Sequence, residues 1–394
     1  MKKSILPIVF CCVMNNSSFA VESNHSYFKN SDFTNDFSVE IKGLGNFSLV
    51  YNHEKVDDKI TSIGDHEFFG LANILISSNY DESFRYGVKI VNAISNQFGS
   101  SLGAEVFLEG FLGKLEFGGL KDVTEKMRVG ADTLSVGTGG IGGDASKYNS
   151  SIELMDFLMA PGTLMNQNFG YYDQELRHKW GGKFSNKINY TTPEFFGFQA
   201  GLSLKPNVTI NKHDDVTVLS NKVNLGTFIS GGINYINTFG DFGIAMALIY
   251  EENFANPVNI SDKVKETIGG KFKSGEISLS LSYFGLSIAG SYGKNSRNIK
   301  DVNLADLNIT KNRGRYFTYG LSYEMGSFCV SATFFDSKND DDRKLWSDSY
   351  AVKYNISRNL SWYGEYIGYK FSGNDLDKKH GNAFGVFTGI LLQF

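Results

Sequence analysis

About sixteen segments of this chain alternate apolar and polar residues with a period of two. Successive side chains of a β-strand point to opposite faces, so this period is typical of strands with one face in an apolar environment. In the last segment Gly385 and Gly389 fall on one face, and apolar side chains fall on the other: Phe384, Val386, Ile390, Leu392 and Phe394. The pattern therefore predicts an all-β fold of short antiparallel strands.

The connections between these segments alternate in length. The predicted strands span residues 38–51, 68–77, 84–92, 102–110, 113–118, 182–191, 197–205, 223–237, 242–250, 276–284, 286–293, 315–324, 328–336, 347–355, 360–371 and 383–394. Seven short turns and eight long polar loops join them in strict alternation. Outer-membrane barrels have short periplasmic turns and longer outer loops. We therefore predict a transmembrane, antiparallel, up-and-down β-barrel of about sixteen strands, with both termini on the periplasmic side.

The composition is compatible with this barrel and with a soluble β-sandwich. The chain has 33 Phe, 20 Tyr and 43 Gly but only 5 Pro, and its mean hydropathy is −0.21. Barrel strands that alternate apolar and polar residues average to such a value, and aromatic residues near strand ends would form interface girdles. In a sandwich the same rings would fill the core. We favour the membrane, because a soluble fold would leave many apolar stripes uncovered.

The N-terminal segment, residues 1–20, has the features of a secretory signal peptide. Lys2 and Lys3 precede a short apolar run, and Ser18 and Ala20 supply the small residues of a cleavage site. Residues 21–35 would then form a lead-in, and residues 36–394 the barrel. Cys329 would be the single remaining cysteine, which excludes an intrachain disulfide. We therefore expect export followed by assembly in the outer membrane of a Gram-negative cell.

The longest connection, residues 119–175, does not alternate like a strand. It contains a glycine cluster at 137–143 and then a helical pattern at 150–160 that Pro161 ends. Ser150 and Glu153 have the spacing of a capping box at the start of this pattern. Loops of this length are usually functional or disordered. We predict that this loop folds into the bore of the barrel and narrows it.

The predicted helix 150–160 has two distinct faces. Its apolar arc contains Leu154, Met155, Leu158 and Met159. Glu153 and Asp156 lie three residues apart on the opposite side, where they would face water. An ordinary amphipathic surface helix with solvated acids would show the same pattern. The barrel pattern of the remaining chain favours placement against the inner wall.

Other chemistry receives little support from the sequence. Gly137–Gly142 matches G-x-G-x-x-G, but a dinucleotide site needs this motif inside a parallel βαβ unit, so we expect a flexible segment and no cofactor. None of the six histidines stands at metal-ligand spacing, and no G-x-S-x-G elbow occurs. We therefore expect neither a metal site nor an enzyme. The net charge of −4 also argues against nucleic-acid binding.

Three motifs give the chain a family resemblance. They are the strand and turn at 110–119, the Tyr-Thr-Thr-Pro-Glu-Phe-Phe-Gly-Phe run at 190–198, and the closing strand at 389–394. In this order and spacing they resemble the general porins of Gram-negative bacteria. The likeness covers essentially residues 36–394.

The resemblance implies a sixteen-stranded barrel, usually a homotrimer, whose third outer loop carries acids that face basic residues on the wall. The acids that this implies for the constriction are Asp144, Glu153 and Asp156. The basic residues on the side of the strands that would face the lumen are Lys42, Arg85, Lys89, Lys183 and Lys187. The family likeness also implies that the barrel-assembly machinery reads Phe394. Lysine replaces much of the arginine expected on the wall, and the loop is longer and richer in glycine.

The expected function is a water-filled channel for passive diffusion of ions and small hydrophilic solutes. Two alternatives stay open. The chain could be a structural or adhesive surface barrel whose long loop occludes the bore, or it could be a substrate-specific channel. Outer-membrane lipid would surround the barrel in each case.

Overall fold

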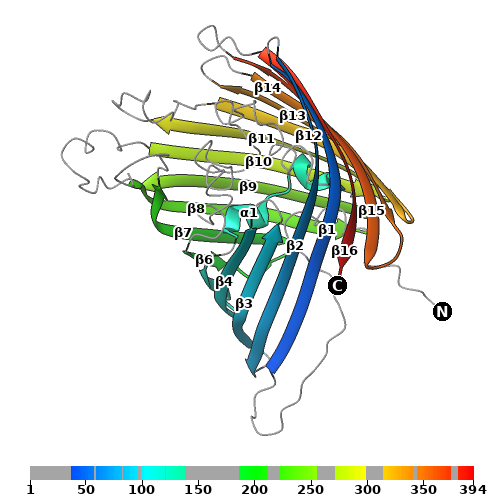
Figure 1. Cartoon of the computed structure of the whole chain (residues 1–394). Coiled ribbons are helices and arrows are strands. Elements are labelled where there is room, and N and C mark those ends of the chain that lie inside the picture. The colour runs from blue at the N-terminus through cyan, green and yellow to red at the C-terminus, as the bar shows by residue number, and fades with distance from the viewer. Residues whose placement is uncertain are drawn as a thin grey trace.

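The computed structural model shows one closed barrel. It describes residues 37–56, 59–81, 83–95, 99–119, 121–137, 186–211, 222–254, 271–298, 314–339, 344–373 and 380–394. The predicted signal peptide and lead-in, residues 1–35, lie outside these ranges. All strand pairs are antiparallel, each strand pairs with its neighbours in sequence, and β1 pairs with β16 to close the ring (Figure 1). The prediction of an all-β barrel of sixteen strands is confirmed.

The strands are named in chain order. They are β1 (Phe37–Val56), β2 (Lys59–Asp81), β3 (Phe84–Ser95), β4 (Gly99–Gly110), β5 (Gly113–Gly118), β6 (Lys187–Thr191), β7 (Phe198–Asn211), β8 (Lys222–Phe239), β9 (Phe242–Phe254), β10 (Lys271–Tyr283), β11 (Leu286–Asn298), β12 (Gly314–Met325), β13 (Phe328–Asn339), β14 (Lys344–Asn355), β15 (Leu360–Ser372) and β16 (His380–Gln393). Between β5 and β6 lie a short helix, α1 (Val123–Met127), and a 3₁₀ turn, η1 (Ala131–Leu134).

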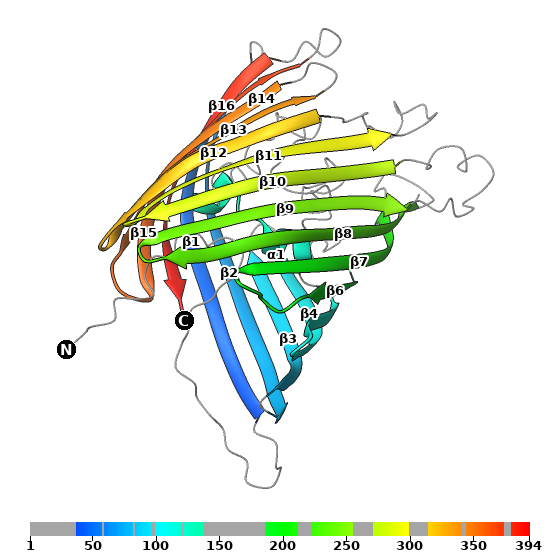
Figure 2. The same ribbon diagram turned by 180° about the vertical axis from the view of Figure 1, so that it is seen from behind.

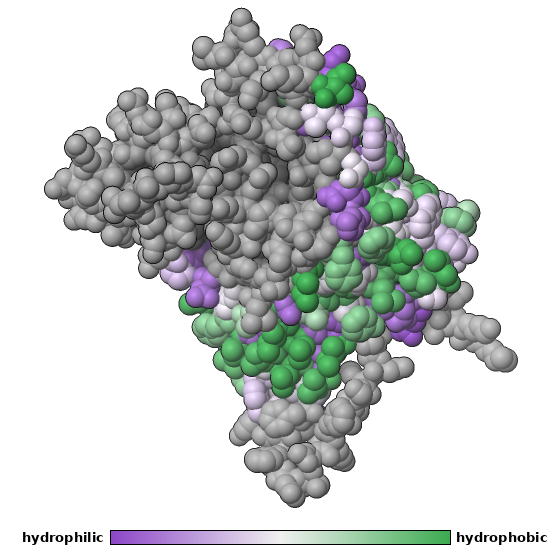
Figure 3. All heavy atoms as spheres, in the orientation of Figure 1, coloured by the Kyte–Doolittle hydropathy of each residue, from purple (hydrophilic) through white to green (hydrophobic). Residues whose placement is uncertain are grey.

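Side chains alternate between the two faces of the wall. In β9 the side chain of Ile249 is buried on the inner face, whereas its neighbour Leu248 is 58% exposed on the outer face. The inner face of β10 carries mainly small polar side chains: Ser274, Ser278, Ser280 and Ser282. Hydrophobic side chains gather on the outer surface where Figure 1 draws β1, β2 and β16 (Figure 3). The barrel is therefore apolar outside and polar inside, as a lipid-embedded barrel requires.

Strands extend into most of the predicted long loops, as two of these loops illustrate. Residues 52–67 were expected to form a loop, but β1 and β2 stay paired up to Val56 and Lys59. Similarly, β3 and β4 stay paired up to Ser95 and Gly99, within the predicted loop 93–101. The apolar alternation fades in both places because strand ends beyond the lipid have no apolar environment on either face. Backbone pairing nevertheless continues there.

Strand β1 meets the last residue of the chain at the seam of the barrel. The Gly43 amide donates to the Phe394 carbonyl at 2.6 Å, and the Phe394 amide donates to the Gly43 carbonyl at 3.1 Å. The Phe394 ring lies directly over Gly43, where an added Cβ would overlap the ring. A glycine at position 43 thus leaves room for the terminal aromatic ring.

The helix α1 and the turn η1 lie inside the ring of strands (Figures 1 and 2). Among the described residues, no helix is long and apolar enough to cross a membrane. α1 packs against β7, β8 and β9, while η1 packs against β11, β12 and β13. The described start of the long connection therefore folds inward, as predicted. The predicted helix 150–160 lies outside the described residues, and α1 was not predicted.

Candidate functional site: the barrel lumen

Residues 121–137, here called the inner segment, follow the inner wall of the barrel. Hydrogen bonds join this segment to several strands around the circumference. The Val123 amide donates to Ser203 Oγ of β7 at 2.8 Å, the Ala131 amide to Thr318 Oγ1 of β12 at 3.3 Å, and the Val136 amide to Ser331 Oγ of β13 at 3.2 Å. The segment thus runs around the wall from β7 to β13, thickening one side of the bore.

Glycines on the wall give α1 its seat. Val123 and Met127 are buried together with Ile249 of β9. A Cβ at Gly201 of β7 would lie 2.5 Å from Val123 Cγ1 and 2.9 Å from Met127 Cε. Gly232 of β8 similarly faces the Met127 sulfur. These glycines let the helix lie directly on the sheet, so it occupies less of the lumen.

Asp122 fixes the start of α1 by two kinds of contact. Its Oδ1 accepts hydrogen bonds from the Glu125 amide at 3.0 Å and from Thr124 Oγ1 at 2.8 Å, which caps the helix. Its Oδ2 lies 2.5 Å from Lys205 Nζ of β7. Lys205 Nζ in turn lies 3.9 Å from Glu251 of β9. All three charged side chains are buried, so the pair joins the loop to the wall away from water.

The Asp122 carboxylate is charged because of its basic neighbours. Burial alone would raise the pKa of this carboxyl group. The positive charges of Lys205 and Lys187, together with hydrogen bonds from Lys205 and the Glu125 amide, outweigh burial and hold the pKa well below its ordinary value. The cap and the ion pair therefore stay intact at neutral pH.

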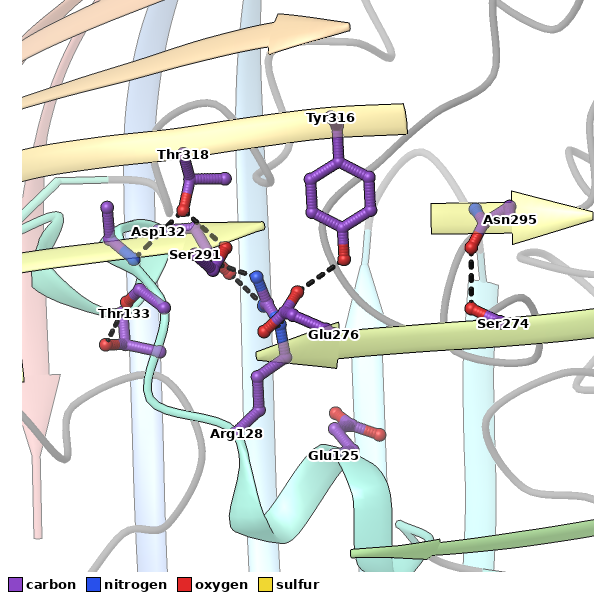
Figure 4. A network of polar contacts seen from close by, with 12 residues as sticks. Glu125, Arg128, Asp132, Thr133, Ser274, Glu276, Ser291, Asn295, Tyr316 and Thr318 are labelled. Carbon is purple, nitrogen blue, oxygen red and sulfur yellow. Dashed lines mark hydrogen bonds and ion pairs between the residues drawn. The ribbon is translucent and has the colours of Figure 1, made fainter. Parts of the chain in front are cut away.

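A second buried contact fixes the chain after α1 (Figure 4). Arg128 Nε lies 2.7 Å from Glu276 Oε1 of β10, and Arg128 Nη2 donates to Asp132 Oδ1 at 2.5 Å. The Tyr316 hydroxyl of β12 donates to the same Glu276 carboxylate. Burial opposes the charge of Arg128, but Asp132 and Glu276 raise its pKa well above the ordinary value. In this contact the inner segment supplies the cation, Arg128, and the wall supplies the anion, Glu276. In the Asp122 contact the inner segment supplies the anion and the wall the cation.

The end of the inner segment meets β15. Ser135 Oγ donates to Glu365 Oε1 of β15 at 3.3 Å, and Ser349 Oγ of β14 donates to the same oxygen at 2.8 Å. A Cβ at Gly137 would overlap the Glu365 carboxylate. The chain therefore passes close to this carboxylate.

A third ion cluster lines a cavity below α1. Glu116 of β5 lies 2.7 Å from Lys114 Nζ and also pairs with Lys126 of α1. The cavity has a volume of about 350 Å³, and residues 191–194, between β6 and β7, form part of its lining. Both lysines and glutamates line this cavity, so the end of the lumen at the short turns carries charges of both signs.

Four of the five predicted basic residues lie among the described residues, on the inner face of the wall. Lys42 pairs with Glu40 at 2.7 Å. Arg85 Nη2 donates to Ser77 Oγ at 3.0 Å. Lys89 stands opposite Glu105 in the β3–β4 register.

Lys187 differs from the other three because it is buried next to the start of the inner segment. The other residues predicted for the pore lie outside the described residues: Lys183, Asp144, Glu153 and Asp156. Whether the predicted acids and bases face each other across a constriction thus stays a prediction.

The sequence reasoning missed the residues that hold the inner segment. They are Glu116, Asp122, Arg128, Lys205, Glu251, Glu276, Tyr316 and Glu365. A local signal existed for one of them, because Asp122 and Glu125 have the spacing of a helix N-terminus. The wall acids could have been assigned to the inner face by their alternation in β9, β10 and β15. No local pattern indicates which loop residue each one meets.

The sequence model of the Gram-negative porin family matches residues 12–374. The chain belongs to this family. An uncharacterized protein of Rickettsia felis is 24% identical over 396 residues, which cover 94% of this chain and 83% of the relative. An uncharacterized protein of Rickettsia prowazekii is 26% identical over 295 residues, or 68% of this chain. The chain spans 59% of the length of this second relative.

Solved porin structures share the fold. The anion-selective porin of Comamonas acidovorans superposes with a TM-score of 0.59 at 18% identity, covering 91% of this chain and 100% of the other. OmpF of Salmonella typhi, solved with daunomycin, superposes with a TM-score of 0.60 at 12% identity and covers 91% and 98%. Family and barrel together support an outer-membrane porin channel.

Proposed function

We propose that this porin lets ions and small hydrophilic solutes diffuse passively across the outer membrane. The observation that carries the proposal is the position of the inner segment. Buried ion pairs and hydrogen bonds hold residues 121–137 along the wall from β7 to β13. A segment held in this way narrows the bore from one side. The small polar side chains on the inner face of β10 and β11 are suited to a water-filled passage.

The charged residues of the lumen suggest that the channel selects solutes by polarity and size more than by the sign of their charge. Lys89 and Glu105 face each other on β3 and β4, and Lys114 and Lys126 flank Glu116. Mixed charges orient polar solutes, which can interact with the charged groups on the wall. They disfavour apolar solutes, which would displace water from these groups without replacing its hydrogen bonds. We therefore propose weak ion selectivity. The Comamonas acidovorans porin, described as anion-selective, is the natural reference for this measurement.

The experiment that tests the proposal is single-channel recording of the refolded mature chain in a planar lipid bilayer. Stepwise openings and a small reversal potential in a salt gradient are the expected result. A correctly folded barrel without conductance would contradict an open channel. Recovery of conductance after deletion of residues 137–160 would then support the alternative of a barrel that its long loop occludes. Current block by low concentrations of one solute would instead indicate a substrate-specific channel.

We also propose that the chain assembles as a homotrimer. One OmpT structure from Vibrio cholerae is described as a trimer form, and the fold is shared at a TM-score of 0.54. Conductance steps that come in threes would support a trimer. Light scattering of the purified protein in detergent, with the detergent contribution subtracted, gives an independent mass. A monomer mass at all protein concentrations would overturn the trimer without affecting the channel.

Phe394 is our proposed signal for the barrel-assembly machinery, as the family likeness implies. Because its ring also lies over Gly43, a Phe394→Ala variant could fail for either reason. Refolding of the purified variant in detergent separates them. Normal refolding with poor insertion in cells is expected, and the matched control Leu392→Ala should insert normally. Equal insertion of both variants in cells would overturn the proposal.

A further inference from the structure

The cavity of about 350 Å³ beside α1 lies at the short-turn end of the lumen and is here called the turn-end cavity. Its lining comes from the ends of β4 and β5 at their shared turn, from α1, and from the segment between β6 and β7. The charged and amide side chains of this lining are Glu109, Lys114, Glu116, Lys126, Glu194 and Gln199. A cavity of this size with a few converging polar groups is the usual form of a small-molecule site.

Hydrogen bonds hold the two short turns around the turn-end cavity in place. The Tyr190 hydroxyl of β6 donates to the Leu112 carbonyl at 2.6 Å, which ties β6 to the turn between β4 and β5. In the turn between β6 and β7, the Phe195 amide donates to the Phe198 carbonyl at 2.8 Å, and the Phe198 amide donates to the Phe195 carbonyl at 2.9 Å. The backbone that carries Glu194 is therefore fixed before any ligand arrives. A preformed site loses little conformational entropy on binding.

Two lysines make the side of the turn-end cavity next to α1 positive. Lys114 Nζ lies 2.7 Å from Glu116 Oε1, and Lys126 Nζ donates to Oε2 of the same carboxylate. Two positive charges thus share one negative charge, which leaves a net positive charge. Both lysines are partly exposed, whereas Glu116 is buried. Because an ammonium group has three N–H donors, each lysine has donors left for a ligand. A carboxylate is the group that best fits these donors.

Two glutamates make the turn side of the same cavity negative. Glu109 stands opposite Lys114 in the β4–β5 register, on the inner face of β4 together with the buried Phe107. Glu194 is exposed between β6 and β7. Within the ranges that the structure describes, neither carboxylate takes part in a hydrogen bond or an ion pair, because Lys114 contacts Glu116 instead. An ammonium group of a ligand can neutralise these two acids.

The distance between the two sides matches the length of a short molecule. Glu109 lies at the level of Lys114 in the register, and Glu116 lies two residues further from the turn. Two residues of strand correspond to about 7 Å. An extended dipeptide has a similar length, since two extended residues span at most about 7 Å. A dipeptide can therefore place its carboxylate at the positive side and its ammonium group at the negative side.

We propose that the turn-end cavity binds small zwitterions of the dipeptide type. The carboxylate of such a solute accepts hydrogen bonds from Lys114 and Lys126, and its ammonium group lies next to Glu109 and Glu194. The inference rests on the proposed diffusion function, since the solute reaches the cavity through the lumen. Short turns are periplasmic in outer-membrane barrels. A zwitterion is therefore held where it leaves the channel.

The test measures binding to the refolded mature chain in detergent, where no channel current is needed. The probe is glycylglycine, and two analogues each lack one of its charges. N-acetylglycylglycine has no ammonium group, and glycylglycinamide has no carboxylate. A titration followed by the NMR signals of the ligand gives the dissociation constant of each compound. We expect each analogue to bind about tenfold more weakly than glycylglycine, because one charge-assisted contact is lost.

The variant Glu109→Gln/Glu194→Gln removes both acids without breaking an ion pair of the described chain. It should bind glycylglycine about tenfold more weakly, for the same reason. Acetylation of the ligand should then have no further effect, because the ammonium group has lost its partners. The control Asp241→Asn removes an exposed acid from the turn between β8 and β9, which does not line the cavity. This control should bind glycylglycine as the wild type does.

Several outcomes would overturn the zwitterion site. Equal binding of all three compounds would mean that neither charge is recognised. Tighter binding of N-acetylglycylglycine would indicate an anion site, and tighter binding of glycylglycinamide a cation site. An equal loss of binding in Glu109→Gln/Glu194→Gln and in Asp241→Asn would also contradict the proposal. None of these results affects the diffusion function, which is tested by conductance in simple salt. A barrel that binds glycylglycine but does not conduct would contradict the diffusion function and support the site.

Discussion

Charged residues are arranged differently on the inner and the outer face of the barrel wall. On the inner face, Lys205 and Glu276 each meet a residue of opposite sign from the inner segment, out of contact with water. On the outer face, Arg315 of β12 and its neighbours on β11, β13 and β14 repeat one sign across four strands. Inside, these charges are satisfied by the chain itself and determine where the loop lies. Outside, the charges lie on the opposite face of the wall and take no part in placing the loop.

Removing one member of an inner pair should have the largest effect. Glu276→Leu leaves Arg128 buried with only Asp132, and removing one partner of a buried pair typically costs about 3–5 kcal/mol. We expect the inner segment to detach from β10, which should appear as rapid proteolysis near Arg128 and as noisier channel current. Glu252→Leu, which removes the partner of the exposed Lys273 on the outer face, is the control. Equal protease resistance in both variants would contradict the anchoring role of Glu276.

Filling the glycine seat should have the next largest effect. Gly201→Leu places a side chain where Val123 and Met127 already lie, and overpacking of this kind costs about 1–3 kcal/mol. The strands of the closed barrel are held by their neighbours and cannot move outward. The added side chain should therefore push α1 into the lumen and lower the conductance. Gly275→Ala faces outward with its nearest neighbour at 3.5 Å and serves as the control. Unchanged conductance of Gly201→Leu would mean that α1 does not limit the bore.

Lowering the pH from 5 to 3 should weaken the Asp122 contact, with a smaller loss of stability than either substitution above. The folded-state pKa of Asp122 is lowered, so its contribution to stability is complete above the unfolded value of about 3.9 and is lost as pH falls below it toward the folded value. Between pH 5 and pH 3, the stability of the wild type should therefore fall more than that of Asp122→Asn. Thermal unfolding at each pH measures this difference. Parallel curves for the two proteins would contradict the assignment.

The exposed pair on the inner segment should matter least. Lys121 and Glu125 are 3.0 Å apart with i, i+4 spacing, and Lys121 is partly exposed. Pairs of this kind contribute about 0.3–0.5 kcal/mol. Lys121→Ala should therefore leave both proteolysis of the segment and conductance nearly unchanged. A loss as large as that of Glu276→Leu would show that burial does not distinguish the two contacts.

The barrel could be predicted from the sequence because every strand faces lipid on one side. In the strand that ends at Phe394, this environment imposes a period of two that is visible without any structure. The prediction was wrong where the environment is the same on both faces, as between Asn52 and Glu67, because paired strands there need no apolar alternation.

The candidate site was less accessible to sequence reasoning. α1 has only five residues, too few for a helical period, although the spacing of Asp122 and Glu125 marks its start. Alternation alone could place Lys187 and Lys205 on the inner face. The stagger of strands far apart in the sequence determines that Lys205 contacts Asp122 and that Glu276 contacts Arg128. Stagger leaves no local pattern in the sequence.

The most direct test of a wall-bound inner segment is a reversible cross-link measured by conductance. The Val136 amide donates to Ser331 Oγ at 3.2 Å, so thiols introduced by Val136→Cys and Ser331→Cys in a Cys329→Ser background should lie within reach of a short, reducible thiol-to-thiol cross-linker in the folded barrel. If the segment already lies on the wall, the cross-linked and the reduced protein should have the same single-channel conductance. A folded barrel that does not cross-link, or a large change in conductance on reduction, would contradict this account.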